Sequence, residues 1–187
     1  MSTALVLIDL QNDYFSGGTM ELVGADAAVT RAAALLRAFR HCALPIFHVQ
    51  HIATRAGATF FLAGTAGAEI HGAVSPVQGE TVVVKHFPNS FRETVLQDQL
   101  RSTGATRLVF AGMMTHMCVD TTVRAAADLG FTCSLAGDAC ATKDLQFLDE
   151  RVAARDVQLA YLAGLHGTFA AVKTAQELCA EISASEA

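Results

Sequence analysis

Short apolar runs, separated by stretches with helical periodicity, limit what this chain can fold into more than any other feature. Three such runs are residues 4–8 (ALVLI), 81–84 (TVVV) and 107–111 (RLVFA). Runs without polar alternation are typical of strands that are buried on both faces of a parallel sheet. Residues 25–41, with apolar side chains at helical spacing, separate the first run from another strand at 45–49. The order strand, helix, strand predicts a right-handed parallel crossover.

The same alternation continues to the end of the chain. Further helices are predicted over 91–102, 119–129, 144–163 (most regular over 156–165) and 174–182, and further strands over 131–136 and 168–173. The sequence therefore predicts an α/β fold, a three-layer, doubly wound, Rossmann-like six-stranded parallel sheet with helices on both faces. The length of 187 residues predicts a single domain over residues 1–187.

Charge and hydropathy exclude several classes of partner. The net charge is −5 and no run of Lys or Arg occurs, so neither nucleic acid nor an anionic membrane is an expected partner. The chain is 52% hydrophobic with a mean hydropathy of +0.36. No uninterrupted apolar run reaches the roughly 18 residues of a membrane span. The high apolar content favours a homodimer or homotetramer that buries surface between its subunits.

Cysteine usage predicts the compartment. The five cysteines are odd in number and include no CxxC pair, which argues against a disulfide framework and structural zinc. A reducing, cytoplasmic location is therefore expected. The first residues, 1–15, have no basic region and run into an acidic strand end, so no signal peptide is expected.

Three chemically different side chains, Asp9, Lys85 and Cys118, stand after predicted strands. Singly, they read as a turn aspartate, a solvated lysine and a small buried cysteine. The carboxyl ends of parallel strands meet in one crevice, however, and an acid, an amine and a thiol there form a complete nucleophilic set. Cys118 begins a helix, and this position, together with Lys85, is expected to favour the thiolate. Asp9 is expected to take the thiol proton and pass it to a leaving amine.

The motifs at these three places resemble one known family. They are residues 8–13 (IDLQND), Lys85 with residues 89–91 (NSF), and residues 112–119 (GMMTHMCV) followed by Thr122 and residues 124–126. Their order and separations are similar to those of the isochorismatase-like cysteine hydrolases, whose relatives include nicotinamidase and N-carbamoylsarcosine amidohydrolase. The resemblance extends over nearly the whole chain.

The resemblance implies a catalytic triad of Asp9, Lys85 and Cys118. It also implies a cis peptide bond between Met113 and Met114. This bond would aim the backbone N–H of Met114, together with that of Cys118, at a developing oxyanion. Family members that lack the cysteine act on a vinyl ether by acid catalysis, so the presence of Cys118 favours a thioester route.

No metal and no other cofactor are expected. Nicotinamidase-type members carry an Asp-x-His pair after the second strand, whereas this chain reads His48-Val49-Gln50-His51 there. On a strand, residues three apart point to opposite faces, so His48 and His51 are not expected to chelate one ion. The missing pair also argues against nicotinamide as the substrate. Whether an ion binds through His51 or the loop residue His71 stays open from the sequence alone.

The long segment 52–80 is glycine-rich and weakly periodic, as binding loops are. Its Phe60 and Phe61 either wall an apolar pocket or anchor the loop to the core. The predicted substrate-binding residues are Tyr14, Phe15, His51, Phe60, Phe61, Phe91 and Met117, beside the oxyanion-hole residues Met114 and Cys118. Because the sequence does not reveal the shape of this loop, it does not name the substrate.

The leading prediction of function is hydrolysis of a C–N, amide-type bond in a small molecule through a Cys118 thioester. The second is isochorismatase activity, the hydrolysis of a vinyl ether, which requires Asp9 but no thiol. The third is a non-catalytic, redox-sensing protein that uses the same thiol. No second cysteine lies near Cys118 in the sequence to resolve an oxidised thiol, which weakens this third reading.

Overall fold

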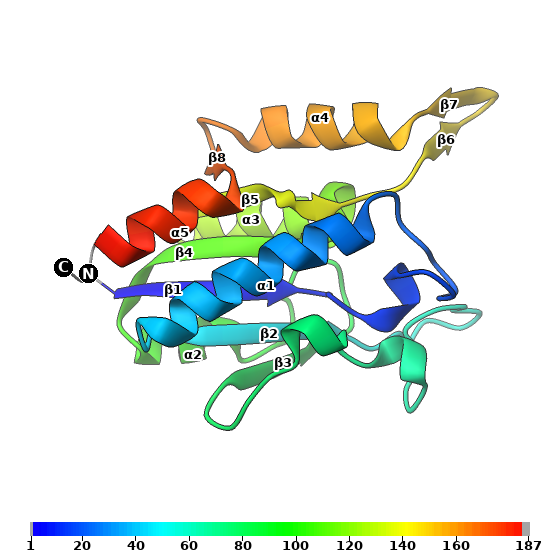
Figure 1. Ribbon diagram of the computed structural model, residues 1–187. Helices are drawn as coiled ribbons and strands as arrows, with labels where there is room; N and C mark the ends of the chain where they lie inside the picture. Colours follow the sequence, from blue (N-terminus) through cyan, green and yellow to red (C-terminus); the bar gives the residue numbers. More distant parts are fainter. Residues whose placement is uncertain (1, 185–187) are drawn as a thin grey trace.

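A computed structural model describes residues 2–184 as a three-layer α/β fold (Figure 1). Its central sheet has six parallel strands in the order β3-β2-β1-β4-β5-β8. The strands are β1 (Ser2–Ile8), β2 (Ile46–His51), β3 (Thr81–Lys85), β4 (Ala105–Met113), β5 (Thr132–Ala141) and β8 (Ala171–Lys173). The strand order reverses between β1 and β4, and ligand sites of such sheets lie beyond the strand ends at this point. The predicted fold class is confirmed.

Helices cover both faces of the sheet. They are α1 (Ala25–His41), α2 (Leu96–Ser102), α3 (Asp120–Asp128), α4 (Ala154–Leu165) and α5 (Ala175–Ala184). α1 and α5 pack side by side on one face, α2 and α3 lie on the other, and α4 lies next to α3 and β8 (Figure 1). No helix among residues 2–184 is long and apolar enough to cross a membrane.

The first strand shows why a continuous apolar run is needed in this position. Leu5 and Leu7 enter the hydrophobic core beneath α1 and α5, whereas Val6 and Ile8 enter the core beneath α2 and α3. All four side chains are at most 2% exposed. Because successive residues of a strand point to opposite faces, a strand between two helical layers has no solvent-facing side.

Two predicted helices begin later than expected. Residues 91–95 form turns, and α2 starts at Leu96. The Asn89 side chain accepts a hydrogen bond from the Phe91 N–H (2.9 Å), and the Thr94 hydroxyl donates to the Ser90 carbonyl (2.6 Å). Such local side-chain bonds compete with helical ones, which explains the delay.

The second late start follows an unpredicted hairpin. Residues 145–152 form the antiparallel strands β6 (Leu145–Phe147) and β7 (Glu150–Val152) where a helix was expected. The Asp144 carboxylate accepts the N–H of Ala154 (2.7 Å) and pairs with Arg151, so one acidic side chain closes the hairpin at the start of α4. β5 is also longer than expected and reaches Ala141, whereas β8 is shorter.

A partly buried charged cluster joins α1 to β2 and to the residue before β3. Glu80 accepts hydrogen bonds from Arg40 Nε (2.6 Å), from Arg40 Nη2 (2.9 Å) and from the Val77 N–H (3.0 Å), and it also contacts His48 Nε2 (2.8 Å). Burial favours the neutral acid, but the bonds from Arg40, Val77 and His48 outweigh it and lower the pKa of Glu80 to about 2. His48 thus contacts Glu80, whereas His51 contacts Lys85 at the strand ends.

A substitution at Gly112 tests how closely β1 and β4 approach each other. Its φ of +144° is rarely adopted by residues with a Cβ, and a methyl group there would lie 2.1 Å from the carbonyl oxygen of Ile8. We expect Gly112→Ala to lower the free energy of unfolding by at least about 3 kcal/mol, measured by urea denaturation. Gly104→Ala, at φ +71° with open space around it, should cost only about 1 kcal/mol. Equal losses in the two variants would contradict the close approach.

Candidate active site

The structure brings Asp9, Lys85 and Cys118 together in a buried cluster at the carboxyl ends of the strands. Lys85 Nζ lies 2.7 Å from Asp9 Oδ2 and 3.2 Å from Cys118 Sγ. Asp9 follows β1, Lys85 ends β3, and Cys118 lies in the π-helical turn Thr115–Val119 between β4 and α3. Asp9 and Lys85 are fully buried, and Cys118 is 5% exposed. Asp9 and Cys118, which are 76 and 33 positions from Lys85 in the chain, therefore share its ammonium group.

The Lys85 ammonium has more acceptors than hydrogens. Besides Asp9 and Cys118, it lies 2.9 Å from His51 Nδ1 and 3.1 Å from the carbonyl oxygen of Phe87. An ammonium has three hydrogens, so these four acceptors share them. A neutral thiol needs none of them, whereas a thiolate does. The cluster can thus move one hydrogen bond to Cys118 when its thiol loses a proton.

His51 is held as a neutral donor. Since Lys85 donates to Nδ1, the ring hydrogen of His51 is on Nε2. Burial, followed by the charge of Lys85, lowers the pKa of His51 to about 4. The ring therefore stays neutral at physiological pH, and its Nε2–H is available to a group outside the cluster.

The charges of the cluster contradict the expectation that Cys118 favours the thiolate. Burial raises the pKa of the Cys118 thiol, the Asp9 carboxylate raises it further, and Lys85 lowers it only in part. Burial opposes the charge of Lys85, but Asp9 and Cys118 outweigh it and raise the pKa of Lys85. The resting site thus holds an Asp9–Lys85 ion pair beside a neutral thiol. The sequence could not show this, because the degree of burial decides the direction.

The Lys85 ammonium contacts one carboxylate oxygen of Asp9, Oδ2, and leaves the other oxygen free of this bond. Oδ1 is buried and has no hydrogen-bond partner within residues 2–184. One carboxylate oxygen of Asp9, one ring nitrogen of His51 and the sulfur of Cys118 lie within 4.8 Å of one another. A buried carboxylate oxygen without a donor is costly, and a nearby thiol or a substrate N–H would satisfy it. Asp9 Oδ1 is therefore the group best placed to accept a proton.

The turn that carries Cys118 begins directly after a cis peptide bond between Met113 and Met114. The carbonyl oxygen of Met114 accepts the N–H groups of Met117 (3.0 Å) and Val119 (3.2 Å). These two bonds close the turn, and α3 continues from Asp120. Cys118 is thereby presented at the N-terminal side of a helix, where backbone N–H groups favour negative charge.

Four of the residues predicted to bind substrate form an aromatic wall next to this cluster. The ring centroid of Phe61 lies 4.6 Å from that of Tyr14, 5.0 Å from that of Phe60 and 5.8 Å from that of His51. Burial, together with the nearby acidic groups, raises the pKa of Tyr14. Tyr14 and Phe61 are each 1% exposed and belong to the core beneath α1 and α5, so Phe61 anchors the loop, whereas Phe60 and His51 are half-buried.

The other three residues predicted to bind substrate lie differently. The ring of Phe15 stacks on that of His71, with a centroid distance of 4.1 Å. Phe91 stacks on Phe131 at 6.4 Å and packs against the core beneath α2 and α3. Met117 lies in the Cys118 turn but is 39% exposed. Their role in binding remains a prediction, with less support than that of the aromatic wall.

Sequence reasoning missed Asp13, which holds the wall in place. Its carboxylate accepts the N–H of Phe61 (2.6 Å) and the hydroxyl of Thr19 (2.8 Å). A methyl group on Gly67 would lie 2.1 Å from Asp13 Oδ1, so the backbone of the long loop presses directly on this side chain. The signal in the sequence was an acidic residue directly before two aromatic ones, in the segment DYF.

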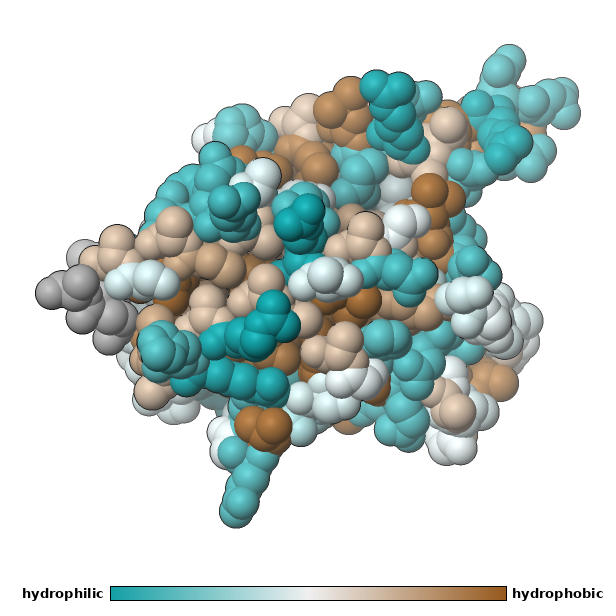
Figure 2. Space-filling model, viewed as in Figure 1, coloured by the Kyte–Doolittle hydropathy of each residue, from teal (hydrophilic) through white to brown (hydrophobic). Residues whose placement is uncertain are grey.

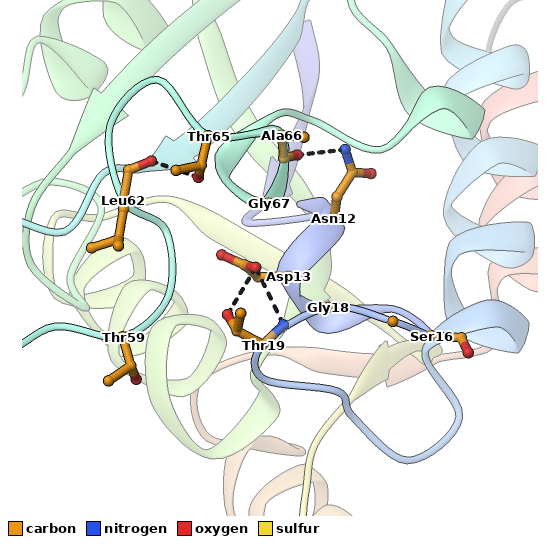
Figure 3. A pocket seen from close by; sticks show the side chains of 11 residues that line it. Asn12, Asp13, Ser16, Gly18, Thr19, Thr59, Leu62, Thr65, Ala66 and Gly67 are labelled. Atoms are coloured by element: carbon orange, nitrogen blue, oxygen red, sulfur yellow. Dashed lines mark hydrogen bonds between the residues drawn. The ribbon is translucent and has the colours of Figure 1, made fainter.

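A cavity of about 400 Å³ lies between the two segments that Asp13 joins (Figure 3). Asn12 Nδ2 donates to the carbonyl oxygen of Ala66 (2.8 Å) and ties the segments together at one end. Thr59, Leu62 and Thr65 line the cavity from the loop side. The long loop is therefore folded around Asp13, and it carries both Phe60 and Phe61.

One group of side chains among residues 2–184 has the composition of a metal site. It consists of Asp9, His51 and Cys118. Lys85 Nζ lies between them, within 3.2 Å of a ligand atom of each, and its positive charge occupies the place a cation would take. His71, the other histidine considered as a metal ligand, uses its ring Nδ1 to accept a hydrogen bond from the Ala73 N–H (3.2 Å). These residues do not fit a metal ion while Lys85 is charged, and the absence of a metal stays a prediction.

Comparison with known proteins places this arrangement in a family. Residues 3–177 match the model of the isochorismatase domain. The chain belongs to the isochorismatase family. Over 94% of its length it is 49% identical to YddQ of Bacillus subtilis strain 168, an uncharacterized isochorismatase family protein of which 98% is covered.

Two further relatives support the same assignment. The secreted isochorismatase effector Isc1 of Verticillium dahliae is 37% identical over 91% of this chain, and 88% of that protein is covered. A crystal structure from Oleispira antarctica, named for the same family, superimposes with a TM-score of 0.93, 48% identity and 96% coverage of each chain. The whole fold, including the strand ends that carry the cluster, is thus shared with members of the isochorismatase family.

Replacing Asp9 tests how the charge of its carboxylate affects the reactivity of the Cys118 thiol. Because the Asp9 carboxylate raises the pKa of Cys118, Asp9→Asn should lower that pKa and speed alkylation of Cys118 by iodoacetamide at neutral pH. A fall of one pKa unit would increase the thiolate fraction about 10-fold. The rate is measured by mass spectrometry of the Cys118 peptide.

The matched control is Asp128→Asn, which changes an exposed carboxylate at the end of α3 and should leave the rate unchanged. A slower alkylation in Asp9→Asn than in the parent protein would contradict the charge balance described here.

Proposed function

We propose that this protein hydrolyses a C–N, amide-type bond of a small molecule through a thioester on Cys118. The observation that carries the proposal is the buried Lys85 ammonium, which contacts both the Asp9 carboxylate (2.7 Å) and the Cys118 sulfur (3.2 Å). An acid, a thiol and a fixed positive charge in hydrogen-bond reach are the groups that nucleophilic catalysis requires. The family consists of hydrolases, and the proposal assigns this chain to its amide-cleaving members.

Two more distant relatives are named as hydrolytic enzymes, and one of these names supports an amide substrate. A streptothricin hydrolase of Streptomyces noursei is 34% identical over 76% of this chain, and the match covers 50% of that protein. Nicotinamidase 3 of Arabidopsis thaliana is 27% identical over 74% of this chain. The names of both proteins describe hydrolytic enzymes, and the second denotes an amidase.

In the first half of the proposed reaction, Asp9 Oδ1 accepts the proton of the Cys118 thiol. The thiolate takes a hydrogen bond from Lys85 and attacks the substrate carbonyl carbon. The carbonyl oxygen becomes an oxyanion, which faces the backbone N–H groups of Met114 and Cys118. As the C–N bond breaks, the protonated Asp9 gives its proton to the leaving nitrogen. An amine or ammonia leaves, and the acyl group stays on sulfur.

In the second half, a water molecule replaces the amine. Asp9, again a carboxylate, accepts a proton from this water while the oxygen attacks the thioester carbon. The C–S bond breaks, a carboxylic acid leaves, and the proton on Asp9 returns to the Cys118 sulfur. Each half-reaction thus leaves Asp9 in the state in which it started. Because the pKa of Cys118 is raised, the thiol is a weak acid that keeps its proton until Asp9 takes it.

The aromatic wall indicates what the substrate looks like. The half-buried ring of Phe60, which packs on Tyr14 and Phe61, favours an apolar body, and His51 Nε2–H favours a hydrogen-bond acceptor close to the scissile bond. Substrate specificity would therefore depend on shape and on one acceptor atom. Within the described part of the chain, the nearest cationic group to the thiol is Lys85, which is already paired with Asp9.

We also propose that the protein is cytoplasmic and forms a homo-oligomer. All five cysteines are free thiols, as in a reducing compartment. Large apolar side chains are exposed on α4 and the β6–β7 hairpin, where hydrophobic residues are visible at the upper surface in Figure 2. Phe147, Leu148 and Leu159 are 74%, 78% and 65% exposed. A homodimer or homotetramer would cover such a surface.

Isochorismatase activity is the second candidate, and the 37% identity to an isochorismatase effector favours it. In that reaction Asp9 would protonate the vinyl ether, and the thiol would have no role. The redox-sensor reading is weaker, because oxidation follows thiolate character and the pKa of Cys118 is raised.

A panel of small amides tests the proposal, with ammonia or amine release as the measurement. The parent protein should turn over at least one amide and form a Cys118 acyl adduct visible by intact mass. Cys118→Ala should lower kcat by at least about 1,000-fold, because the nucleophile is lost. Isochorismate is tested in parallel, with pyruvate release as the readout. Pyruvate release that is unchanged in Cys118→Ala would overturn the thioester mechanism in favour of the second candidate.

A further inference from the structure

A glutamine on α4 reaches the turn that carries Cys118. The hydroxyl of Thr115, the first residue of that turn, donates to Gln158 Oε1 at 2.6 Å. The carbonyl oxygen of Ala141 lies farther from the same hydroxyl, at 3.1 Å. Thr115 is fully buried, and Gln158 is half-buried. The bond therefore links a peripheral helix to a residue directly after Met114, whose N–H is the proposed oxyanion donor.

The amide of Gln158 can lie in only one orientation. Its Nε2 donates to the carbonyl oxygens of Gly137 and Cys140, each at 3.2 Å. Rotating the amide by half a turn would point its own oxygen at these two carbonyl oxygens, which cannot donate. Oε1 is thus required to face Thr115. Both N–H groups and the oxygen of the side chain are used.

These bonds cross an irregular part of the sheet. The pairing of β4 with β5 shifts register between Phe110 and Gly112, so that Gly112 lies opposite Cys140. Gly137 lies in the extra length of β5, and Cys140 follows it where pairing resumes. Gln158 joins this extra length to the start of the Cys118 turn. It supports the turn at a place where the regular ladder of backbone hydrogen bonds is interrupted.

We propose that Gln158 is a positioning residue that holds the Met114 N–H in place by fixing Thr115. This inference rests on the proposed function, because it assigns that N–H to the oxyanion hole. Gln158 acts through Thr115 and touches no reacting atom. A shift of the turn by a fraction of an ångström would move the N–H away from the oxyanion while leaving the sulfur exposed to reagents.

Two reagents separate these effects without any need for the natural substrate. Acylation of Cys118 by p-nitrophenyl acetate passes through an oxyanion, whereas alkylation by iodoacetamide is a direct displacement at carbon that forms none. Gln158→Met keeps the length of the side chain and removes its three hydrogen bonds. We expect about 10- to 100-fold slower acylation of Cys118 and alkylation within about 2-fold of the parent.

Controls address the fold and the glutamine itself. Gln176→Met makes the same change at an exposed position of α5 and should alter neither rate. Thr115→Val removes the hydroxyl and should slow acylation to a similar extent, and Thr115→Ser should restore it. Combining Gln158→Met with Thr115→Val should be no worse for acylation than either change alone, because each change already removes the bond between Thr115 and Gln158. If Gln158→Met does not fold, the Val and Ser variants at Thr115 carry the test.

The outcomes distinguish this inference from the proposed function. Acylation of the parent at Cys118, with unchanged acylation in Gln158→Met and Thr115→Val, would overturn the role of Gln158 alone. Equal losses of acylation and alkylation would also overturn it, since the glutamine would then support the nucleophile and not the N–H. A parent protein that is alkylated but never acylated at Cys118 would overturn the proposed function, and this inference with it.

Discussion

The buried Lys85 ammonium is the constraint on which the rest of the site depends. A full charge that is removed from water must be paired and hydrogen-bonded, or it is strongly destabilising. Asp9 supplies the opposite charge from the end of β1, across the intervening strand β2. His51, which ends β2 and pairs in register with Lys85, supplies a neutral acceptor. The strand order of the sheet thus brings Asp9 from β1 and His51 from β2 to the nitrogen of Lys85 at the end of β3.

This arrangement stabilises two states of Cys118 with little movement. While the thiol is neutral, the hydrogens of Lys85 are used by Asp9, His51 and Phe87. When the thiol loses its proton to Asp9, the ion pair weakens and the ammonium can turn one hydrogen to sulfur. Lys85 therefore follows the negative charge from one partner to the other. Preorganised charges of this kind cost no reorganisation at the moment of reaction.

Much of this could be predicted from the sequence where the physical cause is local or follows from the topology. The apolar run of β1 indicates burial on both faces, and strand ends in a parallel sheet must converge, so Asp9, Lys85 and Cys118 could be placed together. The direction of the Cys118 pKa shift could not be predicted, because it depends on burial and on the competing charge of Asp9. The link from Gln158 to Thr115 joins residues 43 apart and follows from no local pattern. The hairpin at 145–152 was missed because the contacts of Asp144 with Arg151 and with the Ala154 N–H join residues 7 and 10 positions apart and follow from no helical or strand periodicity.

The charge of Lys85 can be measured directly by nuclear magnetic resonance with nitrogen-15 labelled lysine. The chain has only three lysines, and Lys143→Arg and Lys173→Arg assign the remaining signal to Lys85. The account predicts that Lys85 Nζ keeps the chemical shift of an ammonium at neutral pH and well into the alkaline range, because Asp9 and the Cys118 site raise its pKa. A neutral amine at neutral pH would contradict the ion pair, and with it the mechanism built on that pair.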